Sequence, residues 1–403
     1  MNEIYDAIVV GGGPAGATSA ALLAKAGWNV LVIEKSQFPR AKVCGEFISG
    51  TTWPLLAQLG IVDDLIKLAG PVVRRVAVFA GTKTVSATLD MSNAEFGGRA
   101  VRRVHLDTLL LQRAKSVGAE ILQPWVLTAF EKKGQIYHCC IGQKSTGQVR
   151  HLRSRLIIAA HGSWEVGVLP TSSRRAAARG GDLFGFKGYF FGSTLPRDLM
   201  PLIAFPGGYG GIVHTGSDRV SLSCCIRRDQ LNLCRKRWPR VKAGTAVLSH
   251  IKDSCAGVAR NMAAVELVDS WLSAGPLRTG IRSFGSEGIF AVGNAAAEAH
   301  PIIAEGISMA IQSAFLLCNQ LIENRASVGS PLILDTAGHE YELQWRKNFS
   351  RRVYIAAALA HVFMRPPTAR VATTILTRLP RLLTVVARWS GKSQAFPSAL
   401  SHT

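Results

Sequence analysis

A glycine-rich run near the N-terminus, Gly11-Gly12-Gly13-Pro14-Ala15-Gly16, constrains the fold more than any other part of the chain. It follows an almost unbroken apolar run from Ile4 to Val10, which predicts a buried parallel strand. A helix is predicted from about Pro14 to Lys25, and a second strand from Asn29 to Ile33 ends in Glu34. This order of strand, turn, helix and strand is typical of a dinucleotide-binding unit.

Each residue type in the run has a physical task. Gly11 permits the tight turn, Gly13 lets the backbone approach a pyrophosphate, and Gly16 lets the helix pack closely on the strand. The helix begins at Pro14, which has no N–H of its own, and from Ala15 on it presents free N–H groups and a positive dipole to the phosphates. We therefore expect all five residues to contact the cofactor.

Two residues after the second strand complete the predicted nucleotide site. Glu34 stands 23 residues after Gly11 and can accept hydrogen bonds from an adenosine ribose hydroxyl. Lys35 follows it and is included in the expected cofactor site. This motif does not by itself separate FAD from NAD.

A second motif lies almost 280 residues further along. A short apolar run, Gly288 to Val292, precedes Gly293-Asn294-Ala295-Ala296, and Pro301 to Ile307 follows with the sequence PIIAEGI. This segment resembles the flavin-contacting segment of the aromatic-hydroxylase and geranylgeranyl-reductase flavoproteins, whose pattern is roughly GDAA, then P-x-x-G-E-G-I and a helix. The resemblance makes FAD the expected cofactor.

The resemblance also implies roles for residues in this segment. Gly293 and Asn294 would contact the ribityl chain, and Gly306-Ile307 would open a helix facing the pyrimidine end of the flavin. A helix N-terminus there can stabilise negative charge on a reduced flavin. Asn294 replaces the usual aspartate, but its amide can still accept a hydroxyl hydrogen bond.

Three further segments carry the resemblance. Phe38 to Glu46 resembles the K-x-C-G stretch of geranylgeranyl reductases, which implies that Cys44 lies near the flavin, either as a proton donor or as a small packed residue. Arg103 begins an R-x-x-x-D-x-x-L pattern, and the resemblance implies contact with the pyrophosphate. Phe205 to Gly211 resembles a sheet segment of the substrate domain, where Tyr209 either lines the substrate pocket or belongs to an exposed turn.

The family's middle D-G motif appears here as His161-Gly162. In the hydroxylases the aspartate supports both FAD and NAD(P)H. Its replacement leaves open whether NAD(P)H or another donor reduces the flavin.

We expect an α/β fold with a Rossmann-type, hydroxylase-like FAD-binding domain, a β-sheet substrate domain and a helical C-terminal region. The predicted boundaries are 1–70, 98–165 and 272–325 for a discontinuous FAD-binding domain, 71–97 and 166–271 for the substrate domain, and 326–403 for the basic helical region.

Composition limits the partners and the compartment. The formal net charge of +21 favours an anionic partner, but no nucleic-acid motif accompanies it. The eight cysteines form no C-x-x-C pair or zinc-like set, so we expect reduced thiols and no metal centre. No basic leader region opens the chain and no apolar run reaches bilayer length, so we expect a cytoplasmic protein.

The C-terminal region leaves two interpretations open. Residues 343–403 hold ten basic residues and no acidic one, with apolar runs between them. They either contact an anionic membrane at its inner face or form a helical cap whose arginines are solvated.

Three functions fit these observations. The first is an FAD-dependent reductase of a lipophilic, unsaturated substrate such as an isoprenoid or polyketide. The second is a flavin monooxygenase that hydroxylates an aromatic or polyketide substrate, and the third is a flavin-binding scaffold without activity. The fold serves reduction and oxygenation alike, so oxygen consumption coupled to product is the observation that separates them.

Overall fold

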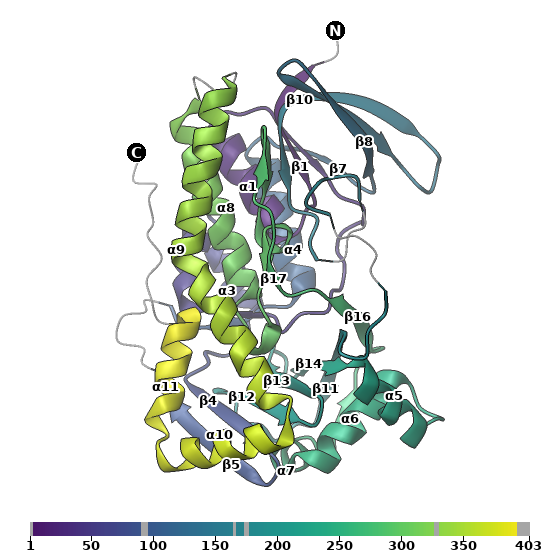
Figure 1. Ribbon diagram of the computed structural model, residues 1–403, viewed down its shortest axis with the longest axis vertical. Helices are drawn as coiled ribbons and strands as arrows, with labels where there is room; N and C mark the ends of the chain where they lie inside the picture. The colour runs from purple at the N-terminus through teal and green to yellow at the C-terminus, as the bar shows by residue number, and fades with distance from the viewer. Residues whose placement is uncertain (1–2, 90–95, 164–166, 173–176, 326–329, 393–403) are drawn as a thin grey trace.

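The computed structural model describes residues 3–89, 96–163, 167–172, 177–325 and 330–392. Two large β-sheets occupy the upper and lower halves of the molecule in Figure 1, and a long helix runs beside both. This arrangement confirms the α/β class predicted from the sequence.

The first sheet, the cofactor sheet, has eight strands in the order β18-β19-β10-β1-β2-β7; β9 also pairs with β10, and β8 pairs with β9. Its strands are β1 (Ile4–Val10), β2 (Val30–Ile33), β7 (Glu120–Leu122), β8 (Val126–Lys133), β9 (Ile136–Gly142), β10 (Val149–Ala159), β18 (Gly285–Ser286) and β19 (Ile289–Ala291).

The parallel strands of this sheet end together. Val10 of β1 is paired with Ile33 of β2 and with Ala159 of β10, which is paired in turn with Ala291 of β19. The segments that follow these four strands therefore meet at one edge of the sheet. In open α/β sheets this carboxyl edge is where ligands bind.

Three of the helices are layered beside this sheet. Small side chains on α1 (Pro14–Lys25), including the buried Ala17 and Ala21, allow close packing on β1 and on α8 (Gly306–Glu323). Helix α9 (Pro331–Phe363) covers α8 with Tyr341, Trp345 and Phe349, which share one buried helical face. The Tyr341 hydroxyl donates to the Ala291 carbonyl at 2.8 Å, which ties α9 to β19.

The second sheet, the substrate sheet, is mostly antiparallel and has the order β15-β11-β14-β13-β12-β4-β5, with β16 beside β11. Its strands are β4 (Arg75–Ala80), β5 (Lys83–Thr88), β11 (Leu183–Phe191), β12 (Leu199–Phe205), β13 (Gly208–His214), β14 (Val220–Arg227), β15 (Glu266–Leu267) and β16 (Leu272–Leu277).

Different helices cover the two faces of the substrate sheet. One face packs through Phe79, Ile203 and Ile226 against the core formed with α5 (Arg228–Arg237), α6 (Ala243–Ser254) and α7 (Ala256–Asn261). On the other face, Val76, Val78 and Ala204 pack against the end of α9 and against α10 (Pro366–Arg378) and α11 (Arg381–Ala387). The C-terminal helices therefore form a cap on both domains.

The remaining elements complete the described chain. Two pairs of short strands are β3 (Phe47–Ile48) with β6 (Arg99–Ala100), and β17 (Gly280–Ile281) with β20 (Ala297–Glu298). The remaining helices are α2 (Trp53–Gln58), α3 (Val62–Leu68) and α4 (Arg103–Ser116), with 3-10 turns at Gly50–Thr52, Gly293–Ala295 and Pro301–Ile303 and a π-helical turn at Arg388–Lys392.

The structure differs from two sequence expectations. The boundary predicted at residue 272 assigned Leu272–Leu277 to the FAD-binding domain, whereas β16 pairs with β11 of the substrate sheet. This short strand contains Gly275 and Pro276 and lacks a clear alternation of apolar residues, so no strand was visible there. Helices α5 to α7 also occupy a region expected to be mainly sheet. No helix among the described residues is long and apolar enough to span a bilayer.

Candidate functional site

The glycine-rich turn between β1 and α1 has no space for side chains at two positions. A Cβ at Gly11 would lie 2.4 Å from the Ala160 carbonyl oxygen, and φ at Gly11 is 114°. A Cβ at Gly16 would lie 1.9 Å from the Gly11 carbonyl oxygen. These two glycines therefore let strand, turn and helix pack against β10, as the sequence pattern predicts.

Gly13 is different because the space beside it is open. It is the residue before α1, whose first turn contains Pro14 and Ala15, and a Cβ there would contact only the guanidinium groups of Arg40 and Arg103, each at 3.9 Å. Free N–H groups of the helix start and two arginines thus surround a space next to the backbone. This arrangement suits an anion such as a pyrophosphate.

A third cation lies close to the two arginines. Burial and the charges of Arg103 and Arg40 lower the pKa of Lys42 to about 8. Asp107 partly balances this charge, because it binds Arg103 through two hydrogen bonds of 2.6 and 2.7 Å and lies 3.6 Å from Arg40. Glu34, 3.9 Å from Arg40, is a second carboxylate nearby. Three cations against two carboxylates leave the region with a net positive charge, which suits a phosphate.

Glu34 marks the other end of the predicted nucleotide site. Its carboxylate is buried at the end of β2 and accepts hydrogen bonds from the backbone N–H of Gly12 at 2.7 Å and of Ser36 at 2.8 Å. These bonds fix it beside the glycine turn, where a ribose hydroxyl could join it. Lys35 points to solvent from the same corner, and its role in cofactor binding stays a prediction.

The second flavin motif lies against the first. A Cβ at Gly293 would come within 2.9 Å of the Ala15 side chain, so this glycine lets the two segments approach closely. Asn294 donates from Nδ2 to the Ser163 hydroxyl at 2.7 Å. Gly306 starts α8 with open space around it, and Ile307 is buried beside it. The structure thus brings together motifs that are far apart in the sequence.

The segment that contains Cys44 passes from the cofactor sheet to the substrate sheet. The Cys44 carbonyl accepts a hydrogen bond from the Ser223 hydroxyl on β14 at 2.9 Å. Glu46, two residues later, lies 2.5 Å from the Lys187 ammonium on β11 and accepts from the Tyr189 hydroxyl at 2.6 Å. The Cys44 thiol, which is partly exposed, is therefore held at the contact between the two domains.

Sequence reasoning missed most of these partners. Lys187 stands alone in the apolar strand LFGFKGYFF, and this isolated charge was the only signal that it had a buried partner. Arg40 was part of the predicted segment but was given no role. Ser223 and Tyr189 carried no signal, because hydroxyl groups are ordinary in strands.

Tyr209 lies on β13 and is buried beneath Ala360 of α9, so the alternative of an exposed turn is wrong. Its hydroxyl lies 3.1 Å from Nδ1 of His300, whose Nε2 lies 3.0 Å from the Thr279 hydroxyl. Burial, with the nearby His361, lowers the pKa of His300 to about 4. This histidine is therefore neutral at pH 7, and contact between Tyr209 and substrate stays a prediction.

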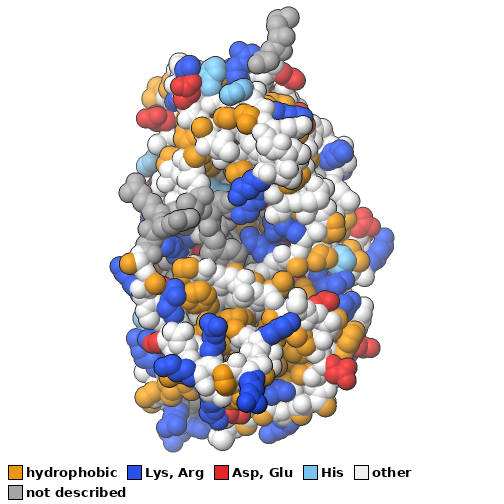
Figure 2. Space-filling view, turned by 90° about the vertical axis from the view of Figure 1, so that its right-hand side faces the viewer, with side chains coloured by type: hydrophobic (Ala, Val, Ile, Leu, Met, Phe, Trp, Pro, Cys, Tyr) orange, Lys and Arg blue, Asp and Glu red, His pale blue; other side chains and the backbone are white. Residues whose placement is uncertain are grey.

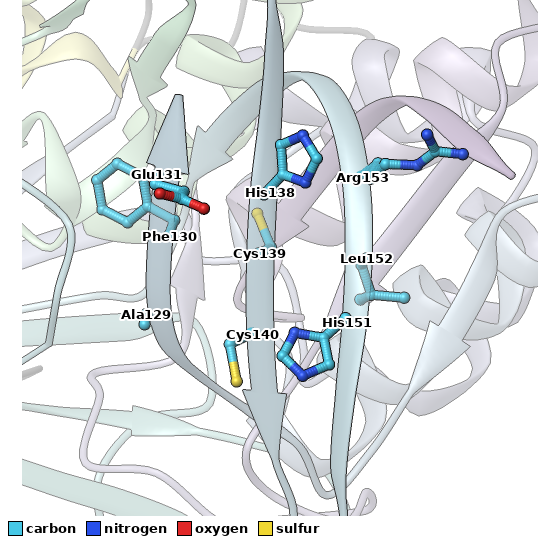
Figure 3. A pocket seen from close by; sticks show the side chains of 9 residues that line it. All are labelled: Ala129, Phe130, Glu131, His138, Cys139, Cys140, His151, Leu152 and Arg153. Atoms are coloured by element: carbon cyan, nitrogen blue, oxygen red, sulfur yellow. The ribbon is translucent and has the colours of Figure 1, made fainter. Parts of the chain in front are cut away.

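One further depression lies on the arm formed by β8, β9 and β10, and Figure 3 shows the side chains that line it, among them Glu131, His138, Cys140 and His151. It opens over the amino-terminal half of β10, whereas the glycine turn meets the opposite end of that strand at Ala160. We therefore place the functional site at the glycine turn and not in this depression.

Comparison with known proteins identifies the N-terminal part of the chain, which contains the glycine turn. Residues 4–170 match the model of an FAD binding domain, which contains the glycine turn, Glu34, Cys44 and Arg103. The N-terminal part of the chain is therefore an FAD binding domain, and FAD is its cofactor.

Similar sequences include reductases. The chain is 26% identical to digeranylgeranylglycerophospholipid reductase 1 of Methanopyrus kandleri over 86% of this chain and 87% of that protein. It is 38% identical to menaquinone reductase of Mycobacterium tuberculosis, over 30% of this chain and 29% of that protein. It is 25% identical to conditioned medium factor receptor 1 of Dictyostelium discoideum over 80% of this chain, but spans only 64% of that longer protein.

Solved structures share the fold. The flavin-dependent brominase Bmp2 aligns with 98% of this chain and 94% of its own, with a TM-score of 0.77 at 20% identity. A geranylgeranyl bacteriochlorophyll reductase-like protein of Thermoplasma acidophilum aligns with 96% and 99%, with a TM-score of 0.71 at 18% identity. Both matches extend over the cofactor sheet and the substrate sheet.

The residues present fit FAD. Open space at Gly13, three nearby cations and the helix start suit the pyrophosphate, and Glu34 suits the adenosine ribose. On the opposite side, Asn294 and the start of α8 are available to the flavin end. We therefore expect FAD to bind between the glycine turn and the Cys44 segment.

Gly13→Val should abolish retention of FAD, because its branched side chain would fill the open space that the pyrophosphate needs. The protein itself should fold, since a Cβ at Gly13 contacts only two guanidinium groups at 3.9 Å. The measurement is the ratio of flavin to protein absorbance after gel filtration. Gly181→Val, in open space on another loop, serves as the matched control. Full yellow colour in the Gly13 variant would show that the pyrophosphate lies elsewhere.

The affinity for FAD should fall above pH 8. In the FAD-free protein the Lys42 ammonium loses its proton as the pH rises through about 8, whereas a bound phosphate favours the protonated form. The dissociation constant of FAD should therefore rise by up to about tenfold per pH unit above pH 8. Fluorescence titrations at pH 7 to 9.5 measure this, and Lys42→Met should flatten the profile while Lys115→Met, exposed on α4, should not. An unchanged profile in Lys42→Met would contradict the assignment.

Proposed function

We propose that this flavoprotein reduces a lipophilic, unsaturated substrate of the isoprenoid or polyketide type. The observation that carries the proposal is the position of Cys44 at the contact between the cofactor domain and the substrate sheet. Its carbonyl is bound by Ser223 of β14, and Glu46 anchors the same segment to Lys187 of β11. A thiol held in this place can meet a substrate that lies between FAD and the sheet.

Reduction of a carbon–carbon double bond needs a hydride and a proton. FAD, once reduced, supplies the hydride. The Cys44 thiol would supply the proton to the neighbouring carbon, and its partial exposure allows solvent to restore that proton. The Arg103 side chain faces the expected pyrophosphate region, and its backbone N–H donates to Glu46. Arg103 would therefore hold FAD and the Cys44 thiol at a fixed position relative to each other.

Two relatives support a lipid substrate. One is a digeranylgeranylglycerophospholipid reductase that aligns with most of this chain, and the other is a menaquinone reductase with higher identity over a shorter stretch. The match covers 29% of the menaquinone reductase and 64% of conditioned medium factor receptor 1, so these two proteins carry less weight than the digeranylgeranylglycerophospholipid reductase, which is covered to 87%.

Oxygenation is the second candidate. The brominase fold match is as extensive as the reductase match, and a fold alone does not select the reaction. His161 in place of the family's aspartate, with its ring nitrogens near the Gly162 carbonyl and the Thr171 hydroxyl, also leaves the electron donor open. The decisive experiment must therefore supply electrons independently of any nicotinamide.

The proposal is tested in a single turnover without oxygen. The flavin is photoreduced, mixed with geranylgeranyl lipids, menaquinone or a polyketide, and followed by its absorbance while product is identified by mass spectrometry. We expect reoxidation with a product two hydrogens heavier than the substrate. Product that forms only when oxygen is admitted, and that carries an added oxygen or halogen, would contradict a reductase.

In the same assay, Cys44→Ser should keep its FAD and reduce turnover by about 10²-fold or more, as expected when a positioned acid is lost. Cys140→Ser is the matched control, because that thiol is also partly exposed but lies on β9, far from the glycine turn. Equal turnover in the two variants with every reactive substrate would return Cys44 to a packing role.

A further inference from the structure

Exposed hydrophobic side chains are concentrated at the C-terminal end of the described chain. Of sixteen large hydrophobic residues that are exposed among the described residues, seven lie between Tyr354 and Trp389. These seven are Tyr354, Val371, Ile375, Leu379, Leu382, Val385 and Trp389. A cluster of this kind on a protein surface is typical of a docking site.

The helical spacing places these residues on outward faces. On α10 and at its C-cap, Val371, Ile375 and Leu379 recur every four residues, whereas Ala369 and Leu376 are buried. On α11 and the turn after it, the exposed residues are spaced three and four apart, while Leu383 and Ala387 are buried. Both inner faces pack on β4 and β5, and Figure 1 shows both helices on the outside of these strands.

Arginines border the exposed apolar residues. Five of them are exposed and have no carboxylate partner among the described residues: Arg365, Arg370, Arg378, Arg381 and Arg388. The guanidinium group of Arg351 lies over the Trp389 ring, 4.8 Å from its centroid. Lys83 of β5 adds a cation beside α10, where it binds the Thr374 hydroxyl at 2.6 Å. No acidic residue occurs in residues 343–403.

We propose that this arginine-bordered face, formed by the outward residues of α10, α11 and the Arg388–Lys392 turn with Tyr354 and Arg351, docks the protein on an anionic lipid bilayer. Apolar side chains would enter the boundary between headgroups and acyl chains, while the arginines bind lipid phosphates. The helices would lie on the bilayer and not cross it. The cap predicted from the sequence and the membrane surface are thus two faces of the same helices.

The chemistry of this face fits a bilayer better than other partners. In a symmetric dimer the same surface meets itself, so its unpaired arginines would face one another and repel. On a nucleic acid the arginines would find phosphates, but the exposed apolar side chains between them would gain nothing, because such interfaces are polar. Only a charged membrane offers anionic groups above an apolar layer.

The inference is independent of the proposed function, because it rests on the exposed residues alone. Its test measures membrane binding and not turnover, so a negative result for membrane binding would not contradict the proposed reductase function, and the reverse also holds. A bilayer source would, however, suit a lipophilic substrate.

The test is co-sedimentation of the full chain with vesicles of phosphatidylcholine alone or with phosphatidylglycerol. We expect binding only to the anionic vesicles, and weaker binding as salt is added. Because basic side chains also cover much of the lower half of the face in Figure 2, net charge alone could attract the protein. Matched variants separate these two causes.

The face variant carries Val371→Ser, Ile375→Ser, Arg378→Gln and Arg381→Gln. The control carries Leu233→Ser, Val241→Ser, Arg235→Gln and Arg240→Gln, which remove the same number of exposed apolar residues and cations near α5. All eight side chains are exposed, so FAD content and circular dichroism should be unchanged. The face variant should bind about thirtyfold more weakly, and the control should bind nearly as the parent does.

Three results would overturn the proposal. They are a full chain that ignores anionic vesicles at low salt, equal losses in the two variants, and dimerisation of the free protein that the face variant alone abolishes. Quenching of Trp389 by brominated lipid provides a second readout, and Trp389→Phe should reduce the quenching if the face enters the bilayer. Equal quenching in parent and variant would place the ring outside it.

Discussion

The arrangement of the two domains depends on one buried ion pair. Glu46, on the segment that leaves the cofactor domain, and Lys187, on β11 of the substrate sheet, lie 2.5 Å apart with their side chains fully buried. Burial lowers the pKa of Lys187, and the charge of Glu46 opposes this change. Removal of either partner would leave an isolated charge in the interior, at a cost of about 3–5 kcal/mol. The pair therefore helps to hold the two domains together at this contact.

The same carboxylate also orders the cofactor site. Glu46 accepts a hydrogen bond at 2.9 Å from the backbone N–H of Arg103, the first residue of α4. The Arg103 side chain, held by Asp107, lies beside Gly13, where we expect the pyrophosphate. Cys44, two residues before Glu46, is thus connected through one side chain to the FAD site and to the substrate sheet. This connection is the physical basis of the proposal that reduction takes place at this contact.

Local sequence patterns predicted the elements of the cofactor half well, because the residues that form them are close together in the sequence. Strand, turn and helix are adjacent around Gly13, and Glu34 follows the next strand, so spacing alone brings them to one sheet edge. The substrate half depends on contacts between distant residues. Nothing near Lys187 points to Glu46, and Tyr209 is covered by α9, which comes from the end of the chain. Which side chains of α10 are buried and which are exposed could likewise not be predicted from the sequence, because this depends on where β4 and β5 lie.

The most direct test of this account is the accessibility of Cys44 to an alkylating reagent, measured by mass spectrometry with and without FAD. Cys44 and Cys140 are partly exposed, and the other six cysteines are buried, so Cys140 is an internal control in every sample. If Cys44 lies between FAD and the substrate sheet, bound FAD should slow its alkylation and leave the rate at Cys140 unchanged. Equal alkylation of Cys44 in the FAD-loaded and FAD-free protein would contradict the account.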